Sequence, residues 1–182
     1  AGFWTEYLWF DSLSLSSVWT SVLWAKIGLG LLFTATFFVL LWMNLYIADR
    51  LAPKVRPPGP EDELSRRWQQ FTSSRTVLIR SSISLLFALL VGAGVSSQWQ
   101  SWLFFTNRVD FGIVDQQFGI DVGFYVFQLP FLTFVVSWAF AAIIVIFVVT
   151  TIQHYLNGGI RLQGQAGSRV TPQAKAHLSP LL

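Results

Sequence analysis

The sequence predicts an all-α membrane protein with three transmembrane helices, and composition and charge distribution both support this fold class. Of the 182 residues, 53% are apolar and only 12% are charged, whereas a soluble domain has about 25% charged residues. This composition excludes a soluble enzyme, a disordered tail and a nucleic-acid-binding module. Three long segments contain no Asp, Glu, Lys or Arg, namely 27–48, 81–107 and 122–160. Each is long enough to cross a hydrocarbon layer of about 30 Å as a helix of about 20 residues.

The chain begins with a segment, 1–26, that we expect to lie along the outer membrane surface. Its start, AGFWTEYLWFDSL, has five aromatic side chains and two acids, which is typical of the headgroup layer. The first transmembrane helix is predicted at 27–48. Lys26 lies at its outer boundary, where a long side chain can extend toward water.

An inner loop, 49–80, follows and contains seven of the twelve basic residues. Prolines between 53 and 60 oppose helix, and three acids follow Pro60, where they complement a helix dipole. Apolar residues then recur at helical spacing, which predicts an interfacial cytoplasmic helix. The candidate contacts to lipid head groups are Arg66, Arg67, Arg75 and Arg80. The alternative is that these basic residues only fix the orientation of the chain.

The second transmembrane helix is predicted at 81–105, and small side chains recur along it every four residues. These helix-packing residues are Ser84, Ala88, Gly92 and Ser96. Small residues in one row allow another helix to approach closely within lipid. Gly30 and Thr34 form a shorter row in the first span, so we expect both faces to contact other helices.

An extracytoplasmic loop, 106–130, is predicted to be structured, because it interleaves aspartates with glycines and phenylalanines. Asp110, Asp115 and Asp121 are candidate contacts to a partner. The alternative is an ordinary turn-forming loop that binds nothing, since the spacing of the acids is not that of a known calcium loop. The third transmembrane helix is predicted at 131–152.

The last segment, 153–182, is predicted to be cytoplasmic and to start a further helix, because Thr171 and Pro172 form a typical N-cap and first helical position. Ten of the twelve basic residues fall in 49–80 and 153–182. The positive-inside bias therefore places both segments in the cytoplasm and the N-terminus outside. Because an outward N-terminus needs an earlier span, we expect the chain to be part of a longer protein.

Residues with catalytic or metal-binding chemistry are few. His154 and His177 have no metal-ligand spacing, and the chain has no cysteine. We expect both histidines to be interfacial or solvated. No serine lies in a nucleophile-elbow context, and no carboxylate pair lies within a span. The sequence therefore predicts no catalytic residue, no metal site and no enzyme, and it identifies no cofactor.

Four motifs carry a resemblance to a known family. They are EYLWFDSL, NRVDFGIVDQQFGIDVGFYVFQLPFL, HYLNGGIRLQ and RVTPQAKAHLS. Together they resemble the large bacterial integral membrane proteins of uncharacterised protein family 0182, and the match extends over nearly the whole chain. The resemblance implies about seven N-terminal spans, of which these would be the second to fourth, followed by a large extracytoplasmic region. It also implies a bacterial envelope location, but no reaction.

These observations favour a non-catalytic integral membrane domain that serves as an anchor, scaffold or accessory subunit of a bacterial membrane assembly. Its expected location is the bacterial inner membrane, as a multi-pass protein. Its expected partners are the lipid bilayer and other transmembrane helices, with no nucleic acid. The alternative is a component of a transporter or channel, although no ionisable side chain lies in the central part of a span. A membrane enzyme that acts through a missing outer region is the third reading.

Overall fold

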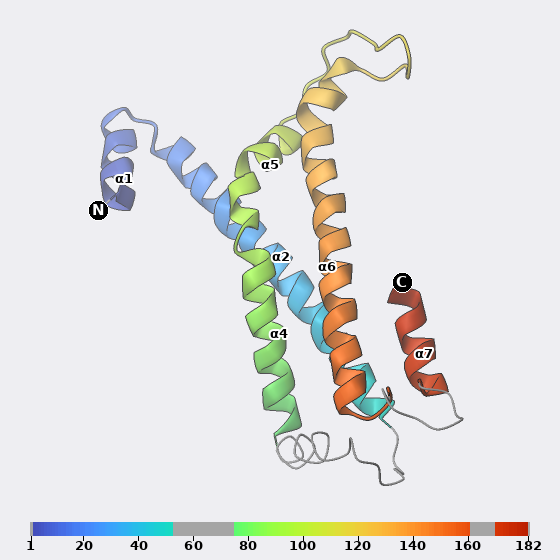
Figure 1. Cartoon of the computed structure of the whole chain (residues 1–182). Helices are drawn as coiled ribbons and strands as arrows, with labels where there is room; N and C mark the ends of the chain where they lie inside the picture. The colour runs from blue at the N-terminus through green and yellow to red at the C-terminus, as the bar shows by residue number, and fades with distance from the viewer. Residues whose placement is uncertain (1, 53–74, 161–169, 182) are drawn as a thin grey trace. The chain divides into compact units, whose positions relative to one another are not determined.

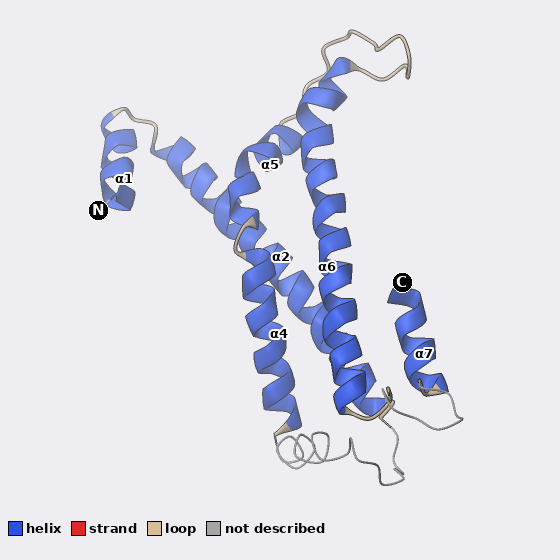
Figure 2. Cartoon of the chain, viewed as in Figure 1, coloured by secondary structure: helices blue, strands red, loops and turns tan. Residues whose placement is uncertain are grey.

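The structure is a computed structural model that describes residues 2–52, 75–160 and 170–181, and most of these residues are helical (Figures 1 and 2). The α-helices are α1 (Gly2–Ser12), α2 (Ser16–Arg50), α4 (Thr76–Gly92), α5 (Trp99–Thr106), α6 (Leu129–Leu156) and α7 (Pro172–Leu178). Short 3₁₀ or π segments are η1 (Val95–Gln98), η2 (Phe124–Gln128) and η3 (Ser179–Leu181). The described residues contain two isolated β-bridges and no strand. The predicted all-α fold class is confirmed.

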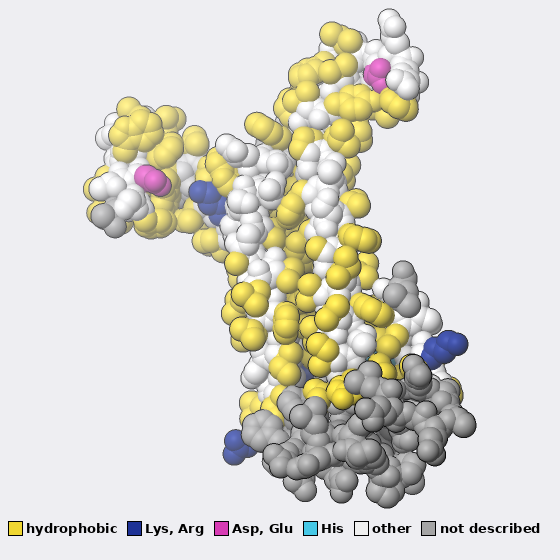
Figure 3. All heavy atoms as spheres, viewed as in Figure 1, with side chains coloured by type: hydrophobic (Ala, Val, Ile, Leu, Met, Phe, Trp, Pro, Cys, Tyr) yellow, Lys and Arg dark blue, Asp and Glu magenta, His cyan; other side chains and the backbone are white. Residues whose placement is uncertain are grey.

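Three helical segments of the described chain are long and apolar enough to cross a membrane. They are Ser16–Arg50, Thr76–Thr106 and Phe124–Leu156. Figure 3 shows hydrophobic side chains exposed along the long helices, as expected of surfaces that contact lipid. Helices suited to the three predicted transmembrane spans are therefore present, although their bounds differ from the prediction.

The first long helix begins well before the predicted span at 27–48. Its first turns are polar, but their hydroxyl groups bond within the helix. Thr20 Oγ1 donates to the Ser16 carbonyl at 3.1 Å, and Ser21 Oγ donates to the Ser17 carbonyl at 2.8 Å. Because these bonds satisfy polar groups without water, the helix can start eleven residues earlier than the charge pattern indicates.

The second span is interrupted, whereas the sequence predicted one continuous helix at 81–105. Helix α4 ends at Gly92, the 3₁₀ segment η1 follows, and α5 begins at Trp99. Gly92 and Gly94 weaken the helix here because glycine loses the most backbone entropy on folding. The Ser97 hydroxyl also donates to the Gly94 carbonyl at 2.6 Å and so supports the tighter turn.

The third span is continuous from Leu129 to Leu156 and extends beyond the predicted 131–152 at both ends. The π segment η2 precedes it directly. At the other end of the chain, α7 begins at Pro172, and its N-cap Thr171 accepts a hydrogen bond from the Ala174 amide at 3.3 Å.

The chain divides into two compact units. The first unit consists of Ala1–Ala35 and Leu90–Trp138, and the second of Thr36–Leu89 and Ala139–Leu182. The core of the first unit is apolar and aromatic. Its buried residues are Leu29, Phe33, Val95 and Phe131, packed against Trp99, Trp102, Phe105, Phe134, Val135 and Trp138.

The second unit buries polar side chains together with apolar ones. The apolar residues include Phe37, Leu41, Leu45, Ala88, Ala142 and Ile146. The polar and charged residues are Arg80, Ser84, Thr150, His154 and Asn157. Buried polar groups are costly in a membrane domain unless they have partners, so the polar residues of this unit are candidates for a functional site.

Candidate functional site

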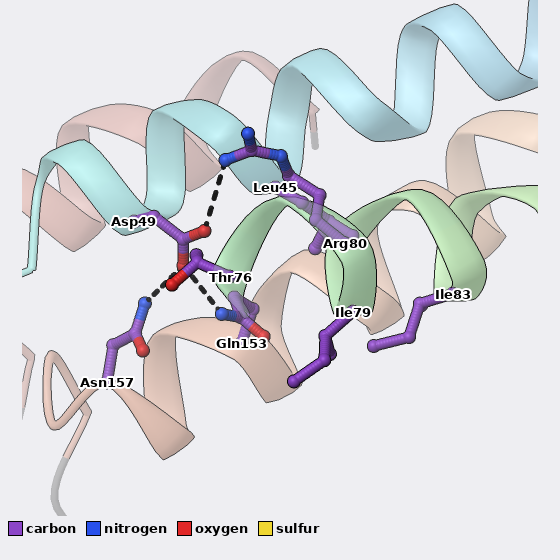
Figure 4. A pocket seen from close by; sticks show the side chains of 8 residues that line it. All are labelled: Leu45, Asp49, Thr76, Ile79, Arg80, Ile83, Gln153 and Asn157. Atoms are coloured by element: carbon purple, nitrogen blue, oxygen red, sulfur yellow. Dashed lines mark hydrogen bonds and ion pairs between the residues drawn. The ribbon is translucent and has the colours of Figure 1, made fainter. Parts of the chain in front are cut away.

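Asp49, near the end of α2, connects three helices of the second unit (Figure 4). Its Oδ2 atom lies 3.4 Å from Nη1 of Arg80 on α4. Its Oδ1 atom accepts hydrogen bonds from Gln153 Nε2 at 2.6 Å and Asn157 Nδ2 at 3.0 Å. Gln153 lies in the last turn of α6, and Asn157 follows that helix directly. We call these four residues the Asp49 cluster. These partners lie on α4 and at the end of α6 among the described residues, so the cluster can hold α2, α4 and the end of α6 together.

The guanidinium of Arg80 is buried, at 7% exposed, and has aromatic as well as anionic neighbours. It lies 4.4 Å from the ring centroid of Trp42 and 5.0 Å from that of Tyr46. These two rings stack in parallel with centroids 5.7 Å apart. Cation–π contacts of this kind are strongest where water is excluded, so they lower the cost of burying the positive charge.

A small cavity of about 30 Å³ adjoins the Asp49 cluster. Besides the cluster, its lining residues are Leu45, Thr76, Ile79 and Ile83. Nε of Arg80 is buried and has no hydrogen-bond partner within the part of the chain that the structure describes. A buried N–H donor normally has a hydrogen-bond partner. A cavity of this size has space for about one or two water molecules, so water is its simplest occupant.

A row of buried polar groups continues from the cluster along α4 and α6. Ser84 lies one turn beyond Arg80, and Thr150 lies one turn before His154. Ser84 and Thr150 are fully buried, and their hydroxyl oxygens have no partner among residues 2–52, 75–160 and 170–181. The sequence predicted Ser84 only as a small packing residue and did not indicate Thr150, because each is an isolated polar residue within an uncharged segment.

The two histidines contact each other, and His154 is buried rather than solvated, whereas His177 is half-buried. Nε2 of His154 lies 2.9 Å from Nδ1 of His177, and His154 is only 1% exposed. The turn after α6 brings α7 back against it, with the Thr171 amide donating to the Gly159 carbonyl at 2.9 Å. Burial lowers the pKa of His177 below its ordinary value. The pair therefore connects α7 to α6.

The predicted small-residue rows of the first and second spans meet in the first unit. A Cβ built on Gly92 would lie 3.2 Å from Cα of Thr34, and one built on Gly30 would lie 2.9 Å from Oγ of Ser96. Close approach of backbones is what small residues permit in a membrane. The other two members of the predicted row, Ser84 and Ala88, are fully buried in the second unit.

The α5–α6 loop, residues 107–123, is built around the carboxylate of Asp121. Its Oδ1 atom accepts hydrogen bonds from the amides of Phe111 at 3.0 Å and Gly123 at 2.6 Å, and its Oδ2 accepts from the amide of Gly112 at 2.8 Å. The bond from Phe111 is the main reason that the pKa of Asp121 is lowered. Gly112 has φ of +69°, a conformation that other residues rarely adopt.

Asp115 organises the tip of the same loop. Its carboxylate accepts from the amides of Gln117 at 3.1 Å and Phe118 at 3.2 Å and from the Tyr125 hydroxyl at 3.0 Å. The Gln117 amide is the main cause of its lowered pKa. Both carboxylates thus bond within the loop, Asp115 also to Tyr125 of η2, while Asp110 is exposed. Contact of the three aspartates with a partner stays a prediction.

The predicted lipid-contact residues fall into three structural situations. Arg66 and Arg67 lie outside the described residues, as does most of the predicted interfacial helix. Arg75 is exposed just before α4. Arg80 is buried and paired with Asp49, so it is a poor candidate for an exposed headgroup contact. Among the described residues, no group of three or more histidines or acids could hold a metal ion.

The spans and the polar Asp49 cluster define a helical membrane protein. The chain belongs to the uncharacterised protein family UPF0182, whose profile matches residues 1–182. A UPF0182 protein of Salinispora tropica is 37% identical over 179 residues, covering 98% of this chain and 18% of the relative. One of Streptomyces coelicolor is 38% identical over 182 residues, covering 100% of this chain and 18% of the relative.

A further relative from Frankia casuarinae is 37% identical over 178 residues, which cover 98% of this chain and 17% of the relative. The chain therefore spans under a fifth of the length of the curated relatives it matches. No solved structure matches the chain. The family membership confirms the resemblance carried by the four sequence motifs.

Proposed function

We propose that this chain is a non-catalytic membrane domain that anchors or scaffolds a multi-pass assembly in a bacterial inner membrane. The observation that carries the proposal is the Asp49 cluster. Its carboxylate bonds to donors on two other helices of the chain, an arrangement suited to holding helices in a fixed relation. A domain with such an internal tie can present its outer surfaces and loops to partners without rearranging.

The close contact between Gly92 and Thr34 supports the same proposal. Packing at this contact depends on shape, because hydrophobic burial gives no advantage between helices already surrounded by lipid. Two independent devices, a polar cluster in the second unit and a small-residue contact in the first, thus fix the spans. Helices that are held in place by contacts within the chain are expected of a scaffold.

Co-purification from mild detergent tests the scaffold role, using the full-length protein in its native host. We expect at least one protein to co-purify in stoichiometric amount. The Gly92→Leu variant should lose that protein because the added side chain would meet Thr34. Gly28→Leu is the matched control, since a Cβ at Gly28 has no heavy atom within 4 Å. Purification of the wild-type chain alone would contradict the proposal.

A transporter or channel component is the second candidate function. It is favoured by the interruption between α4 and α5, since discontinuous helices are typical of transporters, and by the buried hydroxyls of Ser84 and Thr150. Reconstituted full-length protein would then give an ion flux in liposomes, and Ser84→Ala or Thr150→Ala would change it. The scaffold proposal expects no ion flux, either from the wild-type protein or from the variants.

A further inference from the structure

The α5–α6 loop exposes a set of large apolar side chains outside the helices. They are Val109, Phe111, Ile113, Val114, Phe118 and Ile120. Phe118 and Ile113 are 66% and 65% exposed, among the highest values for such residues in the chain. Exposed apolar side chains gathered in one short segment usually mark an interaction surface.

The loop presents these side chains on a fixed backbone. The amide of Val122 donates to the Ile113 carbonyl at 2.9 Å, and the amide of Asp115 donates to the Ile120 carbonyl at 2.8 Å. The carboxylates of Asp115 and Asp121 bond further backbone amides, as described above. A surface that is already ordered loses little conformational entropy when a partner binds, which favours tight association.

The length of the third span places this loop beyond the hydrocarbon layer. Phe124–Leu156 contains 33 residues, which extend about 50 Å as a helix. The predicted span at 131–152 is long enough to fill a hydrocarbon layer of about 30 Å. Residues 124–130 of the same helical segment then carry the loop about 10 Å further. That distance exceeds the headgroup layer of about 5 to 8 Å.

Charge also disfavours lipid as the occupant of this surface. The loop contains three aspartates and one basic residue, Arg108. Ionised carboxylates are costly to transfer into a membrane, and an anionic loop gains nothing from anionic head groups. A protein surface fits better, because it can cover the apolar side chains and leave the carboxylates at a polar rim.

We propose that the α5–α6 loop is the docking surface for an extramembrane part of the same long polypeptide, outside these 182 residues. The curated relatives are more than five times as long as the segment they share with this chain, since that segment covers only 17 to 18% of them. Chain of that length is available to cover a projecting apolar loop at high effective concentration. The inference rests on the proposed anchoring function, and it identifies the anchored part as another segment of the same polypeptide.

Photo-crosslinking in the full-length protein in living cells tests this inference. The photoreactive residue p-benzoylphenylalanine replaces Phe118 in one variant and Ile113 in a second, so a local folding defect at one position does not decide the outcome. The matched control replaces Phe140 on α6, which is 67% exposed on an apolar span. Crosslinked peptides are identified by mass spectrometry after illumination.

We expect both loop positions to form crosslinks with residues of the same chain that lie outside this segment, and Phe140 to form lipid adducts. Lipid adducts alone at both loop positions, crosslinks to a second copy or another protein, or no crosslink at all would overturn the docking inference. These outcomes leave the co-purification test of the scaffold role unaffected. Conversely, if the co-purification test contradicted the scaffold role, we would still expect crosslinks between the loop and other parts of the same chain.

Discussion

Asp49 and Asp121 each accept several hydrogen bonds, but they organise the molecule on different scales. The partners of Asp49 are side chains 31, 104 and 108 residues away. Those of Asp121 are backbone amides 2, 9 and 10 residues away. The first aspartate therefore fixes tertiary structure among helices, whereas the second fixes the shape of one loop.

The electrostatic consequences of the two sites also differ. Asp49 faces a buried cation, so its loss leaves Arg80 without an anion in a region of low dielectric constant. Asp121 faces neutral amides near water, which can replace the carboxylate when it is removed. We therefore expect changes at Asp49 to alter the stability of the domain and changes at Asp121 to alter only the loop.

The largest effect is expected for Asp49→Ala, which should lower the free energy of unfolding by about 3 kcal/mol because it leaves a buried charge unpaired. Chemical or thermal unfolding of purified protein in detergent measures this change. Asp11→Ala, at an exposed acid of α1, is the control and should have no effect. The double variant Asp49→Ala with Arg80→Leu should recover part of the loss. An unchanged midpoint for Asp49→Ala would show that the cluster does not hold the helices.

A smaller and local effect is expected for Asp121→Ala. Amide hydrogen exchange at Phe111, Gly112 and Gly123 should become about tenfold faster, because these amides lose their acceptor. The unfolding midpoint of the protein should stay unchanged. A drop in that midpoint as large as for Asp49→Ala would contradict the distinction between the two aspartates.

The sequence predicted the features that depend on neighbouring residues. Uncharged length predicted three spans, and the four-residue spacing of small side chains predicted the row that includes Gly92. The turn chemistry of the loop, with glycines beside aspartates, predicted a structured segment. In each case the determining interactions lie within a few residues or along one helix, so a single sequence contains them.

The Asp49 cluster was not predicted because its members are far apart in the chain. Asp49 appeared only as a charge that bounds an uncharged segment, Arg80 also as a candidate contact to lipid head groups, and nothing in one sequence indicated that they pair. Gln153 and Asn157 lie near the end of the third segment, where polar residues are also common at membrane interfaces. The interruption after Gly92 was missed because hydropathy does not distinguish one continuous helix from two successive ones.

Acid should disorder the loop only at low pH. Hydrogen bonds from amides lower the pKa of Asp121 below its ordinary value of 3.8. The ordered loop therefore keeps its full stability above pH 3.8 and loses it as the pH falls through the lowered pKa. Cleavage of residues 107–123 by pepsin should accelerate over that range, relative to the acid-unfolded protein. Asp121→Asn should weaken this transition and leave only the part contributed by Asp115, whose pKa is also lowered, and a transition above pH 5 would contradict the assignment.

The smallest effect should occur at the histidine pair, in a different pH range. Burial lowers the pKa of His177 below 6.5, so the undocked form of α7 binds more protons than the docked form. Docking is therefore fully stable above pH 6.5 and weakens as the pH falls toward the lowered pKa. A cysteine introduced by Leu178→Cys, in a segment with no native cysteine, reports docking through its rate of alkylation. Relative to the exposed Lys175→Cys, this rate should rise as the pH falls below 6.5. Addition of His177→Gln should reduce the rise, and a rise of unchanged size would assign it to another group.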